Sequence, residues 1–156
     1  MIPTEARRGP GALVIGCGNA DRGDDAAGLL VARRLRELGV EAQEQSGEAA
    51  ALLDIFESAP AGRRVIVVDA MVTGSPPGSI SFWDAGAVRL SRETFRCSTH
   101  ALGVAEAVEL ARALGKLPLQ LGIYGIEGAG FEAGAQPSRE VLRAVEELAH
   151  RIAREV

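Results

Sequence analysis

The chain has 156 residues, of which 47% are hydrophobic, so it is long enough for one well-buried core and too short for two ordinary domains. Its net charge of -4 and the absence of any stripe of lysine and arginine argue against a nucleic-acid partner. No apolar run reaches the roughly 20 residues that cross a bilayer, and residues 1–10 lack the apolar region of a secretory signal. We therefore expect a cytoplasmic monomer without membrane partners, with a flexible N-terminus over residues 1–10 and a single α/β domain over residues 11–156.

The first part of the chain alternates apolar runs with amphipathic segments. Residues 12–17 (ALVIGC) form a continuous apolar run, which predicts a buried parallel strand. Apolar side chains then recur at helical spacing, which predicts a helix over residues 25–38 that Gly39 ends. Weaker patterns predict an outer strand over residues 40–45 and a second helix over residues 48–57.

The remaining segments begin with the clearest strand, residues 64–70 (RVIVVDA), whose β-branched run indicates a buried central position. Residues 79–84 alternate in polarity and follow a short turn rich in glycine and proline, so we expect this strand to run antiparallel. Residues 100–114 predict a mostly buried helix, residues 118–126 a last strand and residues 138–155 an amphipathic helix. This order predicts a three-layer α/β sandwich, with a mainly parallel sheet between helices.

The loop that joins the first strand to the first helix, residues 16–25 (GCGNADRGDD), carries the first candidate side chains. A dinucleotide fingerprint needs a third glycine where Asp21 stands, and a phosphate loop needs lysine and serine or threonine where Asp24 and Asp25 stand. Two carboxylates would also repel a phosphate at the helix N-terminus. Asp24 and Asp25 point in different directions, so Asp24 can cap the helix while Asp25 faces a crevice. The alternative is that both carboxylates only cap the helix.

Asp69 is the second candidate, because it directly follows the run VIVV. It lies at the carboxyl end of a central strand, where open α/β sheets bind their ligands. If the first and third strands are neighbours, Asp25 and Asp69 face one crevice. The alternative is an aspartate that caps the following turn.

His100 completes the candidate site. Ser98 and Thr99 are good N-cap residues, which places His100 in the first turn of the predicted helix. There the helix dipole disfavours the imidazolium, and the neutral imidazole is the form that binds a metal. The alternative is a packed or capping histidine. We predict that Asp25, Asp69 and His100 contact a divalent metal.

The remaining reactive residues give weaker signals. Cys97 and His100 form a single CxxH pair, which is a weak metal signal without a second pair, so Cys97 is left out of the ligand set. Cys17 is interpreted as a small buried hydrophobe, and both cysteines as free thiols. The chain has no GxSxG elbow and no HExxH motif, so nucleophilic and ordinary zinc hydrolase templates lack support. The catalytic residues are therefore not assigned.

A family resemblance rests on five segments that occur in order between Val14 and Val145: GCGNADRGDDAAG, EQSGEAAALL, VIVVDAMVTGSPPGS, STHALGVAEAVELA and YGIEG. Taken together, these segments resemble the hydrogenase maturation endopeptidases. The resemblance implies an aspartyl-type endopeptidase that removes a C-terminal extension from the large-subunit precursor of a nickel-iron hydrogenase, after nickel insertion, and so regulates that enzyme. It also implies a five-stranded mixed sheet with one antiparallel strand, and metal-contacting roles for Asp25, Asp69 and His100.

The chain departs from the family pattern at two positions. Many relatives carry glutamate where Asp25 stands, and the shorter aspartate moves the ligand inward or leaves room for a water. Many also carry proline where Gly128 follows GIE, which changes the shape of the last loop. Glu127, at the end of the last strand, either lines the crevice or has a structural role.

Two carboxylates and one imidazole make an open site that nickel can occupy but that holds free metal weakly. We therefore expect the nickel to be supplied transiently by the substrate, the hydrogenase large-subunit precursor, and we expect no organic cofactor. One alternative is a non-enzymatic nickel carrier or maturation adaptor that uses the same three residues. Another is a small metal-dependent amidase that acts on a free metabolite.

Overall fold

Five strands form one mixed sheet in the computed structural model, which describes residues 11–95 and 102–156. The order across the sheet is β2-β1-β3-β5-β4. Neighbouring strands are parallel except for the last pair, in which β4 runs antiparallel to β5. The strands are β1 (Leu13–Cys17), β2 (Ala42–Gln45), β3 (Val65–Met71), β4 (Ile80–Asp84) and β5 (Leu121–Glu127). The predicted mixed sheet and its antiparallel strand are confirmed.

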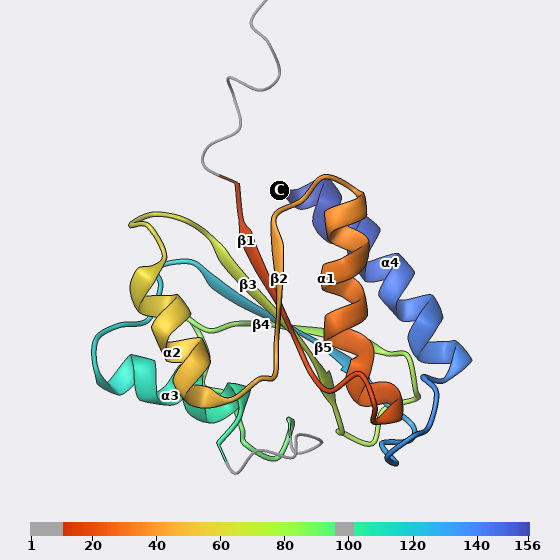
Figure 1. Ribbon diagram of the computed structural model, residues 1–156. Coiled ribbons are helices and arrows are strands. Elements are labelled where there is room, and N and C mark those ends of the chain that lie inside the picture. The colour runs from red at the N-terminus through yellow and green to blue at the C-terminus, as the bar shows by residue number, and fades with distance from the viewer. Residues whose placement is uncertain (1–10, 96–101) are drawn as a thin grey trace, which may run out of the picture.

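The three central strands, β1, β3 and β5, are buried along their whole length. This burial accounts for their continuous apolar sequences, because both faces of a central parallel strand are covered. In the register, Gly16 of β1 is opposite Val68 of β3, and Met71 of β3 is opposite Glu127 of β5. The carboxyl ends of the three strands therefore meet at one edge of the sheet, the lower edge in Figure 1.

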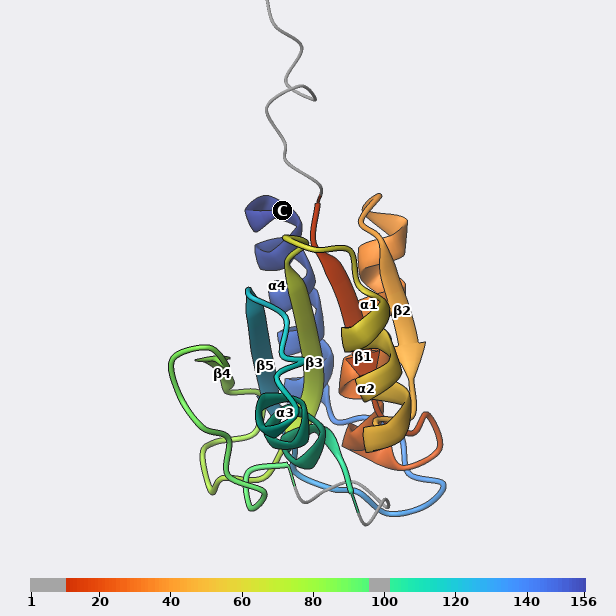
Figure 2. The same cartoon turned by 90° about the vertical axis from the view of Figure 1, so that its left-hand side faces the viewer.

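Helices cover both faces of this sheet. A 3-10 turn, η2 (Gly23–Ala26), leads into α1 (Ala27–Glu37). Helices α1 and α4 lie on one face and α2 and α3 on the other, as Figures 1 and 2 show. The remaining helices are α2 (Ala49–Ser58), α3 (Val104–Ala113) and α4 (Arg139–Glu155). This arrangement confirms the three-layer sandwich.

Each face of the sheet has its own hydrophobic core, because side chains alternate along the strands. Val14, Ile66 and Val68 face the α1/α4 layer, where Leu148 and Ile152 of α4 are fully buried. The neighbouring strand residues face the opposite layer and contact α2 and α3; among them are Ile15, Val65, Val67 and Ile123. One sheet therefore separates two cores.

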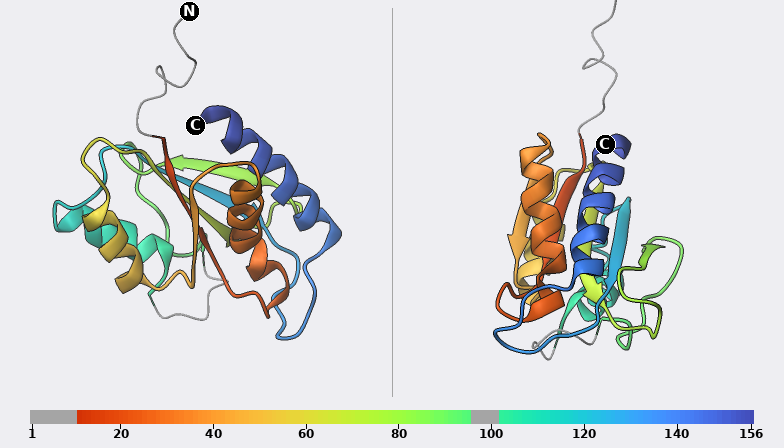
Figure 3. Two further views of the ribbon diagram at one scale, coloured as in Figure 1. Left: turned by 45° about the horizontal axis from the view of Figure 1, so that its top comes forward. Right: turned by 90° about the vertical axis from the view of Figure 1, so that its right-hand side faces the viewer.

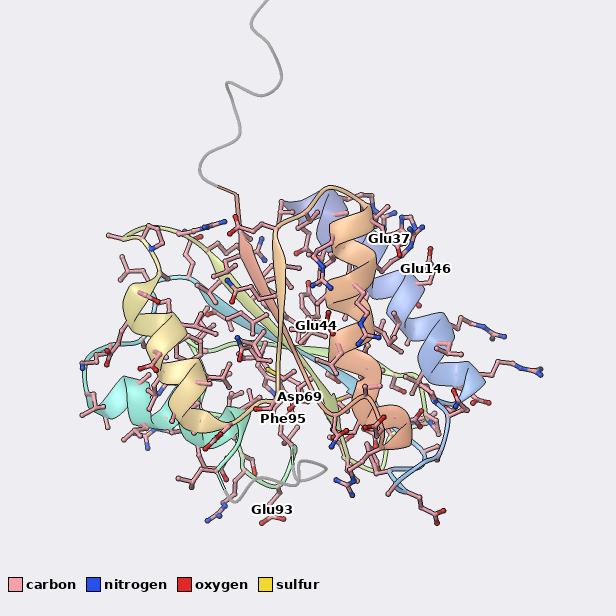
Figure 4. All side chains as sticks on the ribbon, in the orientation of Figure 1. Glu37, Glu44, Asp69, Glu93, Phe95 and Glu146 are labelled. Atoms are coloured by element: carbon pink, nitrogen blue, oxygen red, sulfur yellow. The ribbon has the colours of Figure 1, made fainter. Side chains whose placement is uncertain are left out.

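Polar contacts at the surface add to this packing. Arg34 of α1 donates to Glu146 of α4 at 3.0 Å and to Glu37 at 2.8 Å. Figure 4 shows Glu37 and Glu146 on the two neighbouring helices. Surface ion pairs of this kind contribute little, so apolar burial carries the contact between α1 and α4.

The start of α3 differs from the prediction. The helix begins at Val104 rather than at His100, and Gly103 is its N-cap. Glu106 accepts a hydrogen bond from the Gly103 amide at 3.0 Å, so the cap is made by a residue inside the helix. The prediction that His100 lies in the first turn of this helix is therefore wrong. His100 and the predicted caps Ser98 and Thr99 lie outside the described residues, and the contact of His100 with a metal stays a prediction.

The predicted N-terminal segment, residues 1–10, also lies outside the described residues. From residue 11 onward, the described helices include none that is long and apolar enough to cross a membrane. The first described residues and the end of α4 lie close to each other in Figure 3. Both are at the edge of the sheet opposite the carboxyl ends of the strands.

Candidate functional site

Four charged side chains are buried in the part of the chain that the structure describes, and all four lie at the carboxyl edge of the sheet. They are Asp24, Asp25, Asp69 and Glu127, each 3% exposed or less. Burying a carboxylate is costly unless hydrogen bonds or a cation compensate it. The clustering of all four at one edge therefore marks that edge as the candidate site.

Asp69 lies inside β3 and is opposite Gly125 of β5. Its Oδ1 accepts a hydrogen bond from the Ala70 amide at 2.9 Å. Burial raises the pKa of the Asp69 carboxyl well above its usual range, and the nearby charge of Asp25 raises that pKa further. Figure 4 shows Asp69 at the lower ends of the strands. A cation at this position would relieve the repulsion between the two carboxylates.

Asp25 reaches the same place from the loop between β1 and α1. It lies in the 3-10 turn η2, and its backbone carbonyl accepts from the Asn19 amide at 3.2 Å. β1 and β3 are neighbours, which was the condition for Asp25 and Asp69 to face one crevice, so this turn and the end of β3 share one edge. The structure thus brings together two of the three predicted metal contacts.

Cys17, the last residue of β1, lies next to this pair. Burial raises the pKa of its thiol well above the usual value, and the charges of Asp69 and Asp25 raise the pKa further. A thiol in this environment stays protonated and is a poor nucleophile. Cys17 is thus the buried free thiol that the sequence predicts, whereas Cys97 lies outside the described residues.

Asp24 does not cap the helix, so this part of the prediction is wrong. Neither η2 nor α1 has a side-chain cap. Instead, Oδ2 of Asp24 accepts hydrogen bonds from the amides of Ala129 at 2.7 Å and Gly130 at 3.2 Å. The Ser138 amide donates to Oδ1 at 2.6 Å, and the Ser138 hydroxyl donates to Oδ2 at 3.0 Å. Asp24 therefore binds the loop between β5 and α4.

Glu127 has a similar role on the other side of the site. Its carboxylate accepts from the amide of Thr73 at 2.8 Å, from the Thr73 hydroxyl at 2.9 Å and from the amide of Gly74 at 2.9 Å. Of the two predicted alternatives, the structure thus shows the structural one, in which Glu127 holds the loop between β3 and β4. No local sequence pattern indicated these contacts, because each partner is distant along the chain.

Two glycines allow the Asp25 turn and α1 to approach the sheet closely. A Cβ atom on Gly28 would lie 2.3 Å from the carbonyl oxygens of both Cys17 and Val68. A Cβ atom on Gly16 would lie 2.0 Å from the Gly28 carbonyl oxygen. Only glycine at these positions lets the start of α1 rest directly on β1 and β3.

The chemistry of the described site is that of hard carboxylate oxygens, which suit a divalent cation. Across residues 11–95 and 102–156, no three histidine, cysteine, aspartate or glutamate side chains are arranged to hold a metal ion. His100 lies outside these ranges, so the complete three-residue site stays a prediction.

Solved structures similar to this chain include two hydrogenase maturation proteases and the endopeptidase HycI from Escherichia coli. The endopeptidase HybD from Escherichia coli has a TM-score of 0.71 and 23% identity, over 91% of this chain and 89% of that one. The protease HycI from Thermococcus kodakarensis has a TM-score of 0.66 and 24% identity, over 93% and 91% of the two chains. HycI from Escherichia coli has a TM-score of 0.70 and 23% identity, over 92% and 89%. These likenesses show a common fold.

Sequence comparisons give the family. No curated protein sequence matches the chain significantly. The family model HycI, described as hydrogenase maturation protease, matches residues 47–155, a range that includes Asp69 and Glu127 but not Asp25. Because this match covers more than half of the chain, the protein belongs to the hydrogenase maturation protease family.

Proposed function

We propose that the protein removes the C-terminal extension of a nickel-iron hydrogenase large-subunit precursor after nickel insertion, and that Asp25, Asp69 and His100 contact the nickel carried by that precursor. The observation that carries this proposal is the pair of buried carboxylates, Asp25 and Asp69, at the carboxyl edge of the sheet. Membership of the hydrogenase maturation protease family supplies the reaction class.

The proposed ligand set explains how the protein could distinguish a finished precursor from an unfinished one. Three ligands leave coordination positions open, and in our proposal the cysteine thiolates of the precursor occupy them. Affinity for the precursor then depends on the metal, because the two carboxylates repel each other when no cation lies between them. In this proposal, which we call the nickel checkpoint, the protein binds and cleaves only a precursor that already carries nickel.

The two carboxylates are held in different ways. Asp69 is fixed by β3, whose ladder to β5 includes Asp69 and whose ladder to β1 ends at the preceding residue, Val68. Asp25 is fixed by a turn outside the sheet. Both side chains are almost fully excluded from water, which strengthens their electrostatic interaction with a bound cation.

The test is to mix the purified protein with nickel-loaded and nickel-free precursor and to follow the intact mass of the precursor. We expect cleavage of the nickel-loaded precursor only. Equal cleavage of both forms would contradict the checkpoint. Tight binding of free nickel without cleavage would instead favour a nickel carrier, and activity on short amides without a protein partner would favour a small amidase.

The variant Asp69→Asn tests the site itself. The amide has the size of the carboxylate but lacks its charge, so we expect processing to fall by about 100-fold or more. Asp54→Asn is the matched control, because Asp54 is exposed on α2 and the chemical change is identical. Normal processing by Asp69→Asn would remove Asp69 from the proposed site.

A further inference from the structure

Two loops at the carboxyl edge are bound to each other through Asp24. One is the turn that carries Asp25, residues 18–25, and the other is the β5–α4 loop, residues 128–138. Besides the four hydrogen bonds to its carboxylate, the amide of Asp24 donates to the Gly130 carbonyl at 2.9 Å. These five bonds connect one residue to three positions of the distant loop.

Further backbone hydrogen bonds extend the same contact. The Gly23 amide donates to the Ala135 carbonyl at 3.1 Å, and the Gly134 amide donates to the Asp21 carbonyl at 2.7 Å. Gly23 has a φ of +56°, and a Cβ atom there would lie 2.6 Å from the Gly130 carbonyl oxygen. The turn and the loop thus form one unit with Asp24 buried at its centre.

The orientation of Asp25 depends on this unit, whereas that of Asp69 does not. Asp25 follows Asp24 in η2, so any shift of the Asp24 backbone moves Asp25 with it. Asp69 lies within β3, whose position is set by its ladders to β1 and β5. A change at Asp24 should therefore displace one member of the carboxylate pair relative to the other.

We propose that Asp24 is a positioning residue, which fixes Asp25 at the distance from Asp69 that precursor-bound nickel requires by anchoring the Asp25 turn to the β5–α4 loop. This inference rests on the proposed function. Both carboxylate oxygens of Asp24 accept hydrogen bonds from the β5–α4 loop, at Ala129, Gly130 and Ser138, so its role is assigned to this anchor and not to the metal.

Glu127 supplies a matched control for a purely structural role. Like Asp24, it is a buried carboxylate that accepts from loop amides and one hydroxyl. Glu127 holds Thr73 and Gly74, which lie beyond the end of β3. Loss of its carboxylate therefore leaves the pairing of Asp69 with Gly125 of β5 unchanged. Asp24→Asn and Glu127→Gln therefore remove similar hydrogen bonds but differ in their effect on the carboxylate pair.

The experiment compares processing of nickel-loaded precursor by the wild-type protein, Asp24→Asn and Glu127→Gln, with kcat and KM determined separately. The side-chain amide introduced by Asp24→Asn would place N–H donors opposite the donors of the loop. We expect KM to rise about 10- to 100-fold in Asp24→Asn, because the assigned role of Asp25 is to bind the nickel. Glu127→Gln should lower the thermal stability about as much as Asp24→Asn does. Its KM should stay near that of the wild type.

A second measurement is independent of activity. Hydrogen exchange of the Ala129 and Gly130 amides should accelerate in Asp24→Asn, while exchange in β3 stays slow. An unchanged KM in Asp24→Asn, or an equal rise in KM in both variants, would overturn the positioning role. A wild-type protein that fails to cleave the nickel-loaded precursor would instead overturn the proposed function, and the exchange measurement would still report on the Asp24 anchor.

Discussion

The buried carboxylate of Asp69 lowers the stability of the folded protein at neutral pH. A carboxylate that is almost fully buried and lies near Asp25 is harder to ionise in the folded chain than in the unfolded chain. Its folded-state pKa is therefore raised above the unfolded value, and its contribution to stability is fully present only at a pH below that unfolded value. The contribution is lost as the pH rises through the folded-state pKa.

We predict that Asp69→Asn raises the free energy of unfolding at neutral pH, while it lowers processing. The amide does not ionise, so the advantage of the variant should grow as the pH increases from acidic values toward neutrality. Urea unfolding at a series of pH values measures this difference. A variant that is less stable than the wild type at neutral pH would contradict the prediction, and Asp54→Asn again controls for the chemical change.

Asp24 shows what sequence reasoning at this scale could not reach. Two adjacent aspartates before a helix follow the pattern of N-capping, and local rules therefore assigned Asp24 to the helix. Its actual donors are 105 to 114 residues away in the chain. Ala129 and Ser138 come to lie beside Asp24 only when the strands assemble into the sheet. No local sequence pattern predicts this contact.

Among the four described α-helices, α1 is the one that contains a glycine. Gly28 lets α1 rest on the backbone of β1 and β3. We predict that Gly28→Ala destabilises the protein by about 1–3 kcal/mol, because the added methyl group meets two carbonyl oxygens and α1 must move away from the sheet. The higher helix propensity of alanine offsets less than this amount.

Thermal or urea denaturation measures the effect of Gly28→Ala. Gly11→Ala is the control, since a Cβ atom on Gly11 has no other atom within 4 Å. Equal stability of the wild type and Gly28→Ala would mean that α1 tolerates a larger separation from the sheet.

The elements themselves could be predicted where burial leaves a simple pattern. β3 (VIVVDAM) is apolar at almost every position because both of its faces are covered, so its sequence identified it as a central strand. The start of α3 could not be predicted in the same way. Serine and threonine are common N-caps, yet the helix begins at Val104 after Gly103, where Glu106 completes the cap.

The whole molecule has two cores that share one sheet. Strand residues alternate between the α1/α4 layer and the α2/α3 layer, so neither core can open without disturbing the same strands. Trp83, the one tryptophan of the chain, packs against the α2/α3 core and contacts Phe95. Its fluorescence thus reports on the side of the sheet opposite α4.

We predict that Ile152→Ala, a change in the α1/α4 core, lowers the free energy of unfolding by about 2–5 kcal/mol. The midpoint of urea unfolding should shift equally when it is followed by Trp83 fluorescence and by far-UV circular dichroism, because the two cores unfold together. An unshifted Trp83 transition would show that the two layers unfold independently. Leu142→Ala is the control, since Leu142 lies on the same helix and is 48% exposed.

At this largest scale the sequence was sufficient for the architecture and for the edge of the sheet at which the buried carboxylates Asp25 and Asp69 lie. Asp69 lies near the carboxyl end of one predicted strand, and Asp25 follows the end of another. This pattern predicts that carboxylates collect at one edge of a parallel sheet. The two loops that surround this edge were not predictable, because their shape depends on hydrogen bonds between segments that meet only in the folded chain.

The position of β4 at the edge of the sheet has a consequence for synthesis. The only strand bound to β4 among the described residues is β5, which leaves the ribosome later because a chain emerges N-terminus first. The donors that hold Asp24 emerge later still, ending with Ser138. A nascent chain therefore exposes Asp25 and Asp69 before Ser138, which binds the neighbouring Asp24, has been synthesised.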